Sequence, residues 1–424
     1  MPPSRRVFGG SGMTGEWIDT TIGEQATLQR GIDITKAEQR AGAVPVISSG
    51  GVSSCHDTPA VSGPGVVLGR KGVVGSVYFV VSDYWPHDTT LWVKDFHGND
   101  RRFVYYFFRW MAPRLATMDV GSANPTLNRN HVHPIRICWP PLAEQQAIAH
   151  ILGTLDDKID LNRRTNETLE AIARALFKSW FVDFDPVRAK AEGRDTGLPP
   201  HIAELFPDSF EDSELGEIPS GWRVGPILQR AMLLSGGTPK TERTEFWDGG
   251  ILWASAKDVS QCGQTFLVST ERTITEKGLD GSATQLIPAF STVVVARGAT
   301  TGRMALLGQE MAMNQTCYAL VSRTESPFAL YCQFHYQIAD LVHAAHGSVF
   351  DTITTSTFKN TPFLLPSPRL FAQFEEIVTP LFRRILTSSE QSRSLAALRD
   401  ALLPKLLSGE VRVKDAERMV QPIR

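Results

Sequence analysis

The sequence contains two copies of one pattern, and this duplication limits the folds open to the chain more than any other feature. Gly72 recurs 226 positions later as Gly298, and the same shift relates many other pairs. They include Gly121 and Gly347, Thr126 and Thr352, Pro140 and Pro366, Ile151 and Ile377, and Leu155 and Leu381. Nearer the start of each copy the shift is 205, as from Trp17 to Trp222. This repeat is far longer than a solenoid unit, so we predict two copies of one half, each a mixed domain followed by a helix.

Each copy ends in a long stretch whose apolar residues recur at spacings of three and four. Such a stripe predicts an amphipathic helix of roughly 40 residues. A helix with one apolar stripe needs a partner, and its own duplicate is available, so we predict an antiparallel pair. Two helices in a larger core are the alternative. The candidate residues for the helix seam and for docking of partners are Leu142, Ile151, Leu155, Ile159, Leu169, Trp180, Ile377, Leu381, Ile385, Leu395 and Leu402.

Polar residues interrupt the two stripes at matching places. Asn162 and Asn166 break the first stripe, and Ser388 and Ser392 break the second. Polar residues in a seam cost stability but fix the register between two helices. Pro380 lies inside the second stripe and lacks a backbone donor, so we expect a kink or a late helix start there.

The segments before the helices are predicted to be rich in strands. Short runs with many β-branched residues, such as 65–68, 76–81 and 292–295, are punctuated by glycines. The predicted fold class is α+β: two mixed, strand-rich domains separated by two long antiparallel coiled-coil-like helices, with an internal pseudo-twofold repeat. Segment 183–220 is rich in Pro, Gly, Asp and Glu and is predicted to be an acidic linker.

Composition excludes several classes of protein. The 424 residues are 42% hydrophobic and 21% charged, which excludes a disordered chain and a disulfide-rich miniprotein. No apolar run approaches the roughly 20 residues of a membrane span. The N-terminus lacks the apolar stretch of a secretory signal. The five cysteines are scattered, which favours reduced, buried thiols in a cytoplasmic protein.

Motifs for several chemistries are missing from the sequence. There is no Gly-x-x-x-x-Gly-Lys-[Ser/Thr] loop, no Gly-x-Gly-x-x-Gly after a strand and no Asn/Asp-Pro-Pro-aromatic run. An ATP-driven motor or a methyltransferase domain is therefore not expected in this chain. His131 and His133 would share one strand face and could begin a metal site. Because no third ligand lies at a recognisable spacing, a structural pair is favoured and no metal is expected.

The charge of the chain is unevenly distributed. The net charge is −2, and residues 141–219 hold 16 Asp and Glu against 8 Lys and Arg, so the rest of the chain is neutral or mildly basic.

A cationic glycine turn occurs in both copies. Arg70, Lys71 and Gly72 begin a loop whose N–H groups could cradle a phosphate. Its recurrence at Arg297 and Gly298 strengthens that reading. DNA contact and a plain strand-to-strand turn remain equal alternatives.

Several runs resemble the specificity (S) subunits of type I restriction–modification systems. Residues 140–148, 155–159 and 176–186 resemble the family's central region, and residues 402–410 resemble its C-terminal region. Residues 236–240 and 253–258 resemble the opening of a target-recognition domain. The first domain departs from this pattern, because it opens with Gly-Ile-Asp-Ile at 31–34 where the second has Gly-Gly-Thr-Pro.

The resemblance implies an order of domains along the chain. An extension over 1–12, disordered or preceding the natural start, is followed by target-recognition domain 1 (13–140), the central helix (141–182), the acidic linker (183–220), target-recognition domain 2 (221–367), the C-terminal helix (368–410) and a tail (411–424).

The resemblance also implies a non-catalytic subunit that reads a bipartite, asymmetric site on double-stranded DNA. It would position two methyltransferase subunits and two motor-nuclease subunits, and S-adenosylmethionine, ATP and Mg would be bound by those partners and not by this chain. Three alternatives remain: a subunit of a modification-only adenine methyltransferase, a self-sufficient methyltransferase or nuclease, and a helical adaptor with two non-DNA modules.

Candidates for DNA contact are polar residues near the glycine turns and domain openings, since such side chains read base edges and hold phosphates. An ordinary surface role is as plausible for each. In the first domain they are Arg70, Lys71, Ser76, Ser122, Asn124 and Asn128. In the second they are Lys240, Lys257, Arg297, Thr300, Thr301, Arg303, Ser348, Thr352 and Thr354.

Overall fold

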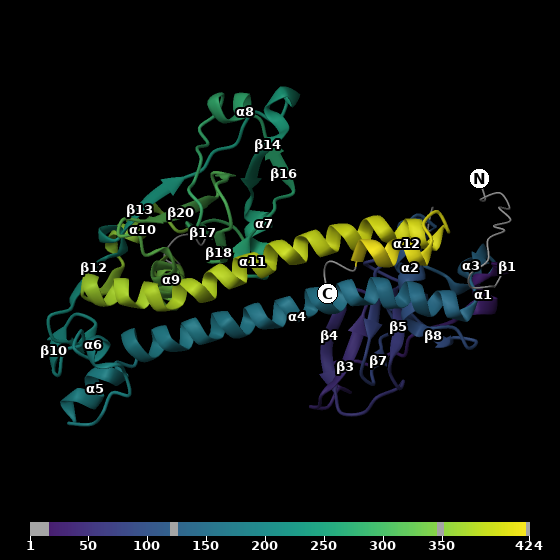
Figure 1. Cartoon of the computed structure of the whole chain (residues 1–424), viewed down its shortest axis with the longest axis horizontal. Coiled ribbons are helices and arrows are strands. Elements are labelled where there is room, and N and C mark those ends of the chain that lie inside the picture. The colour runs from purple at the N-terminus through teal and green to yellow at the C-terminus, as the bar shows by residue number, and fades with distance from the viewer. Residues whose placement is uncertain (1–16, 119–125, 346–351, 421–424) are drawn as a thin grey trace. The chain divides into compact units, whose positions relative to one another are not determined.

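The computed structural model (Figure 1) describes residues 17–118, 126–345 and 352–420. The chain divides into two compact units, one formed by residues 1–158 with 395–424 and the other by residues 159–394. Two helices of 40 residues, α4 (Leu142–Phe181) and α11 (Pro368–Leu407), each contribute to both units. None of the helices within the described ranges is long and apolar enough to cross a membrane.

The first unit contains a four-stranded sheet in the order β2-β8-β5-β6 and a three-stranded sheet in the order β4-β3-β7. Helix α2 packs on β5 and β6, and all five residues of the central strand β5 are buried. In chain order its elements besides the two long helices are β1 (Ile18–Thr21), α1 (Ile22–Gln25), β2 (Thr27–Arg30), β3 (Val44–Ser48), β4 (Gly51–His56), β5 (Gly65–Gly69), β6 (Val77–Val80), β7 (Trp85–Pro86), β8 (Thr90–Asp95), α2 (Arg101–Ala116), α3 (Arg129–Val132), β9 (Arg136–Trp139) and α12 (Val413–Val420).

The second unit contains a five-stranded sheet in the order β13-β20-β17-β18-β15 and a three-stranded sheet in the order β16-β14-β19. Its elements besides the two long helices are α5 (Asp185–Ala191), α6 (Pro200–Ala203), β10 (Phe210–Ser213), β11 (Gly216–Pro219), β12 (Arg223–Pro226), η1 (Ile227–Gln229), β13 (Ala231–Ser235), η2 (Thr244–Phe246), β14 (Trp247–Ala254), α7 (Ala256–Gln261), β15 (Phe266–Leu267), β16 (Arg272–Ile274), α8 (Glu276–Asp280), β17 (Thr292–Val295), β18 (Met304–Leu307), β19 (Ala312–Met313), β20 (Cys317–Ser322), α9 (Pro327–Ala345), α10 (Thr355–Asn360) and β21 (Pro362–Leu365).

The duplication read from the sequence is confirmed by the order of strands. The run β2-β8-β5-β6 corresponds to β13-β20-β17-β18, and β4-β3-β7 corresponds to β16-β14-β19. The antiparallel pair β1 and β9 likewise corresponds to β12 and β21. Helix α9 contacts β17 and β20 in the second unit, as α2 contacts strands of the first sheet. Each copy is thus one α+β domain built on the same plan.

The two long helices pair in antiparallel fashion through the predicted polar positions. In the second unit, Asn162 Nδ2 donates to the Ser388 carbonyl at 3.3 Å and to Ser392 Oγ at 3.2 Å. Asn166 Nδ2 donates at 3.1 Å to Ser389 Oγ, which was not among the predicted positions. Because buried amides must find partners, these bonds make a shifted register costly.

Helix α11 is continuous through Pro380, so the expectation of a late start there is wrong. Proline removes one backbone donor, but Val378 and Phe382 on either side are both fully buried. Tertiary packing of the apolar face therefore outweighs the local cost.

Segment 183–220, expected as an acidic linker, is folded. It contains α5, α6 and the hairpin β10-β11. Val187, Ile202 and Phe206 are buried in one cluster with Trp180 at the end of α4, and the Phe206 and Trp180 rings meet edge to face at 5.1 Å. These apolar residues are widely spaced among charged ones, so composition alone did not reveal the packing.

Two expectations about single residues are corrected. Cys55 and Cys138 are exposed, whereas Cys317 and Cys332 are buried as expected. The two histidines do not share a strand face, because His131 lies in α3. His133 Nε2 instead accepts the Leu28 N–H at 2.9 Å, and burial lowers the pKa of this imidazole.

Candidate nucleic-acid interface

The glycine turns occupy the same place in both domains. One joins β5 to β6 and the other joins β17 to β18. Gly72 has φ of 79° and Gly298 has φ of 96°, in the left-handed region that residues with a Cβ rarely adopt. Glycine is thus required at both positions, which explains why the two copies share it.

The far end of each turn lies against the domain's own helix. A Cβ on Gly75 would lie 2.9 Å from the Ala112 carbonyl oxygen of α2, and one on Gly302 would lie 2.8 Å from a Val342 methyl of α9. Both turns are therefore fixed by helix packing.

One exposed cation stands at the equivalent position of each turn. Lys71 bridges to Thr126 and Arg297 bridges to Thr352 through their backbones, as one antiparallel bridge in each domain. Among the described residues, neither Lys71 nor Arg297 makes a side-chain ion pair. Both cations are exposed and available to a ligand.

The bonds that hold these turns are also duplicated. Leu127 N–H donates to the Arg70 carbonyl at 2.9 Å, and Ile353 N–H donates to the Ala296 carbonyl at 2.9 Å. A rigid backbone that presents a cation on a glycine turn is suited to holding an anion such as a phosphate.

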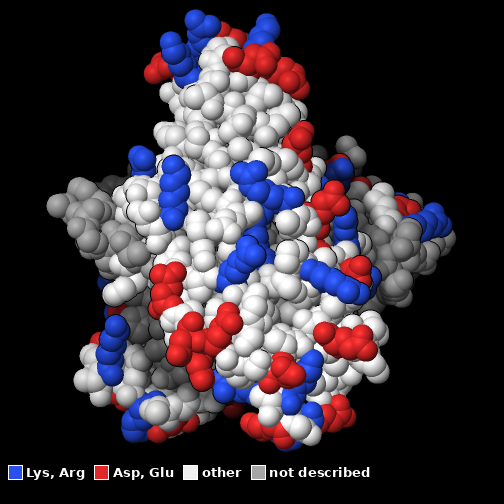
Figure 2. All heavy atoms as spheres, turned by 90° about the vertical axis from the view of Figure 1, so that its left-hand side faces the viewer, with Lys and Arg blue, Asp and Glu red and all other residues white. Residues whose placement is uncertain are grey.

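On the face shown in Figure 2, Lys and Arg side chains are interspersed with Asp and Glu. This distribution agrees with the net charge of −2. On this face, contact with DNA would therefore depend on individual Lys and Arg side chains.

Several other candidates have side chains engaged within the protein. Asn128 and Thr354 are equivalent helix N-caps, accepting the N–H groups of Asn130 at 3.0 Å and Thr357 at 3.2 Å. The Lys257 ammonium lies 2.6 Å from a Glu271 carboxylate oxygen. These contacts account for the three side chains without a ligand.

The remaining candidates divide between engaged and exposed. Ser76 Oγ donates to the Ser49 carbonyl, Thr300 Oγ1 accepts from Ser260 Oγ, and Thr301 Oγ1 donates to the Gly298 carbonyl. The Arg70 guanidinium is half-buried, donates to the Asp88 carbonyl at 3.4 Å, and has its pKa lowered by that burial. Thr352 is half-buried, whereas Lys240 and Arg303 are exposed. Ser122, Asn124 and Ser348 lie outside the described residues.

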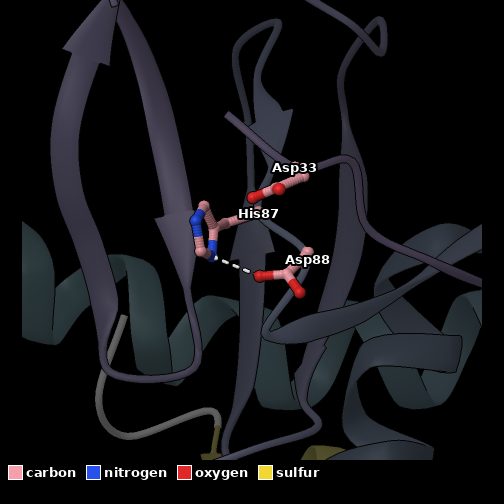
Figure 3. Close-up of side chains that lie close together, drawn as sticks. All are labelled: Asp33, His87 and Asp88. Carbon is pink, nitrogen blue, oxygen red and sulfur yellow. Dashed lines mark ion pairs between the residues drawn. The ribbon is translucent and has the colours of Figure 1, made fainter. Parts of the chain in front are cut away.

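A polar group beside the first turn was missed by sequence reasoning. Asp33, His87 and Asp88 lie close together (Figure 3): one carboxylate oxygen of each aspartate and one ring nitrogen of His87 all lie within 4.8 Å of one another. His87 Nδ1 is 3.3 Å from Asp88, and Arg30 Nη2 donates to Asp88 Oδ2 at 2.9 Å. Asp33 is 54 positions from His87 in the sequence, so no spacing pattern signalled the group.

Most helix candidates lie inside the protein. Leu155, Trp180, Ile385 and Leu402 are buried, as are Ile151 and Leu395. Ile159, Leu169, Ile377 and Leu381 are half-buried, and Leu142 is exposed. These residues mainly form the packing between and around the two helices. The most exposed large apolar residues of α4 are instead Leu161, at 56%, and Ile172, at 50%.

Fold and turns together define a duplicated α+β protein in which each copy presents an exposed cation on a glycine turn, with two long paired helices. The model of the type I restriction modification DNA specificity domain matches residues 15–171 and again 219–387. The chain therefore belongs to the type I restriction–modification specificity family, as the motifs had suggested. Within this family it is a specificity subunit and not a catalytic one.

Named relatives agree with this assignment. The chain is 29% identical to the Type I restriction enzyme HindI specificity subunit of Haemophilus influenzae, over 68% of this chain and 71% of that protein. It is 27% identical to the MjaIX specificity subunit of Methanocaldococcus jannaschii, over 74% of this chain and 69% of that protein. The crystal structure of the S subunit from M. genitalium shares the fold, with a TM-score of 0.57 at 17% identity, covering 92% of this chain and 96% of that one.

Proposed function

We propose that each domain reads one short DNA segment, so that the chain directs a type I restriction–modification complex to a bipartite, asymmetric site. The observation that carries this proposal is the equivalent placement of Lys71 and Arg297 on rigid, duplicated turns. Phosphate contacts position a protein on a duplex, while base contacts supply its specificity. Two domains of one plan but different side chains would read two unlike half-sites.

The partners proposed for the chain are two methyltransferase and two motor-nuclease subunits. S-adenosylmethionine, ATP and Mg would be bound by those subunits, and the complex would act in the cytoplasm. A modification-only complex would contain the same chain without the motor-nuclease.

Docking of the methyltransferase is proposed on an exposed stripe of α4. Leu161, Thr165, Thr168 and Ile172 recur at spacings of four, three and four, so they share one face of the helix. The two threonine hydroxyls donate to carbonyls of their own helix at 2.8 and 2.9 Å, which leaves their methyl groups on an apolar surface. A partner helix could cover this stripe.

Mapping of N6-methyladenine by long-read sequencing, with and without the gene, tests the DNA-reading proposal. Loss of one bipartite, asymmetric methylated motif on deletion is the expected result. An unchanged map in the presence of an active methyltransferase partner would contradict it and would favour the adaptor alternative. For docking, Leu161→Glu with Ile172→Glu should abolish co-purification with the methyltransferase, whereas Glu167→Gln, at another exposed position of α4, should not.

A further inference from the structure

We propose that Asp33, His87 and Asp88 in the first domain, and Thr238, Asn314 and Gln315 at the equivalent positions of the second, contact base edges and set the two half-site sequences. This inference rests on the proposed DNA-reading function and names the residues by which the two domains would differ.

The equivalence of the two sets is structural as well as sequential. Ile32 N–H donates to the Pro86 carbonyl at 2.7 Å in the first domain, and Gly237 N–H donates to the Met313 carbonyl at 2.9 Å in the second. These bonds place Asp33, the residue after Ile32, beside the segment that begins at His87.

The same close approach of two loops occurs in both domains. A Cβ on Gly31 would overlap the His87 carbonyl, and a Cβ on Gly236 would overlap the Asn314 carbonyl. Glycine is needed at both positions for the loops to meet, so the side chains that follow are held at matching places.

Both sets are attached directly to the cationic turns. Arg70 N–H donates to the Thr89 carbonyl at 2.8 Å, one residue before the exposed Lys71. Ala296 N–H donates to the Thr316 carbonyl at 2.8 Å, one residue before the exposed Arg297. A phosphate held by either cation would therefore bring the adjoining duplex next to the polar set of that domain.

In the first domain the set borders a hollow of about 460 Å³. Asp33, Lys36, Ser49, His87 and Thr89 are among the residues that line it. Most of the residues that line it carry a hydroxyl, amide, imidazole or charged group, each of which can hydrogen-bond a base edge.

The two sets differ in hydrogen-bonding chemistry. Carboxylates only accept, and Asp paired with a base most often accepts from the amino group of cytosine. A glutamine amide both donates and accepts, and the exposed Gln315 can pair in bidentate fashion with adenine. Asn314 Oδ1 already accepts from Thr316 Oγ1 at 2.7 Å and from the Thr316 N–H at 3.1 Å, which leaves the Asn314 amide N–H groups to donate to a base. The first half-site is therefore expected to contain a cytosine, and the second an adenine, that depends on these residues.

Charge supports a role of the carboxylates in base reading. A carboxylate is repelled by phosphates. A carboxylate close to a phosphate that is held by Lys71 therefore needs a compensating interaction. Arg30 supplies one to Asp88 at 2.9 Å. Asp33 is exposed and makes no ion pair with a Lys or Arg among the described residues, and an amino group on a base would be a suitable partner. In the second domain Thr238 Oγ1 donates to Gln315 Oε1, which orients the amide.

Selection of bound sites from a random duplex library tests the inference, using the full chain in complex with its methyltransferase. The first variant, Asp33→Thr with His87→Asn and Asp88→Gln, places the second domain's residues in the first. The second variant, Thr238→Asp with Asn314→His and Gln315→Asp, makes the reverse change. Asp19→Asn, at an exposed position on β1, is the matched control.

Each variant is expected to change its own half-site only, with discrimination at the affected position altered about 10- to 100-fold. The control should select the parent sequence. If one variant fails to fold, as judged by thermal unfolding of the complex, the other still decides. If folded variants select the parent sequence with the parent affinity, the inference is wrong but the proposed DNA-reading function is unaffected. Failure of the parent complex to select any sequence would overturn both.

Discussion

In each domain a tryptophan indole donates the equivalent hydrogen bond, but the two tryptophans lie on different strands of the corresponding strand pairs, β3 with β7 and β14 with β19. In the first domain Trp85, on β7, donates its indole N–H to the Ile32 carbonyl at 3.1 Å. In the second the donor is Trp253, on β14, which reaches the equivalent Gly237 carbonyl at 3.0 Å. In the parallel pairing of β3 with β7, Trp85 lies opposite Val46, and in the parallel pairing of β14 with β19, Trp253 lies opposite Ala312.

This difference shows what the duplicated plan preserves. The tryptophan and the small residue opposite it have thus exchanged strands between the two domains, while the indole hydrogen bond to the backbone carbonyl is kept. The scaffold depends on filling a space and satisfying a carbonyl, not on which strand supplies the indole. The tryptophan and its small partner are thus exchanged together between the domains, whereas Asp33, His87 and Asp88 beside the first turn are replaced by Thr238, Asn314 and Gln315 in the second.

A second difference lies where each long helix meets its domain. Gln145 of α4 accepts the Asp100 N–H at 3.0 Å, just before α2. Glu375 of α11 accepts the Ala329 N–H at 2.7 Å, in the first turn of α9. Burial raises the pKa of the Glu375 carboxyl to about 7, because the charged form loses hydration. The second contact should therefore respond to pH, and the first should not.

The largest effect is expected from removing the tryptophans. Trp253→Ala should lower the free energy of unfolding by about 3–5 kcal/mol, because the side chain is buried. Trp85→Ala should cost less, since Trp85 is only half-buried. Urea unfolding followed by circular dichroism measures both. The double variant Trp253→Val with Ala312→Trp copies the arrangement of the first domain and should recover much of the lost free energy of unfolding. If it recovers none, the two strands do not exchange the large and the small residue as proposed.

The next effect concerns pH. The folded pKa of Glu375 lies above the value of about 4.3 of an unperturbed Glu, so its stabilising contribution is full below that value and is lost as pH rises through about 7. Glu375→Gln should remove a decline of about 3 kcal/mol in the free energy of unfolding between pH 4 and pH 8. An unchanged decline in this variant would exclude Glu375 as its source. Gln145→Glu, which places a buried carboxyl at the contact between α4 and the start of α2, should introduce a decline with rising pH in the first unit.

Smaller and equal effects are expected from the two turn cations. Lys71→Ala and Arg297→Ala should each weaken binding to all duplexes, and each should reduce the slope of log affinity against log salt by about 1. Fluorescence anisotropy at several salt concentrations measures this slope. Lys94→Ala, at an exposed position on β8, is the control. A change in selected sequence without a change in slope would assign base reading, not phosphate contact, to the cation.

The smallest effect is expected at the two helix caps. Asn128→Ala and Thr354→Ala should each lower the free energy of unfolding by about 1 kcal/mol, because an N-terminal N–H loses its acceptor. Asn128→Ser and Thr354→Ser should restore most of that stability. If the alanine variants kept full stability but lost DNA affinity, the side chains would be ligands and not caps.

The sequence alone determined the duplication, the two long helices, their polar register positions and the family. Each of these depends on periodicity, glycine at special backbone angles or long runs of similar residues, which are visible along the chain. The pairing of Asn162 with Ser388 and Ser392 could be predicted because both stripes break at matching places.

Tertiary structure alone decided which polar side chains are available. Asn128 and Thr354 are engaged as caps and Lys257 in an ion pair, while Asp33 and His87 come together from 54 positions apart. It also decided the packing of segment 183–220 against Trp180. The physical reason is that a side chain's partners are set by sheet pairing and close packing between distant segments, and neither leaves a period in the sequence.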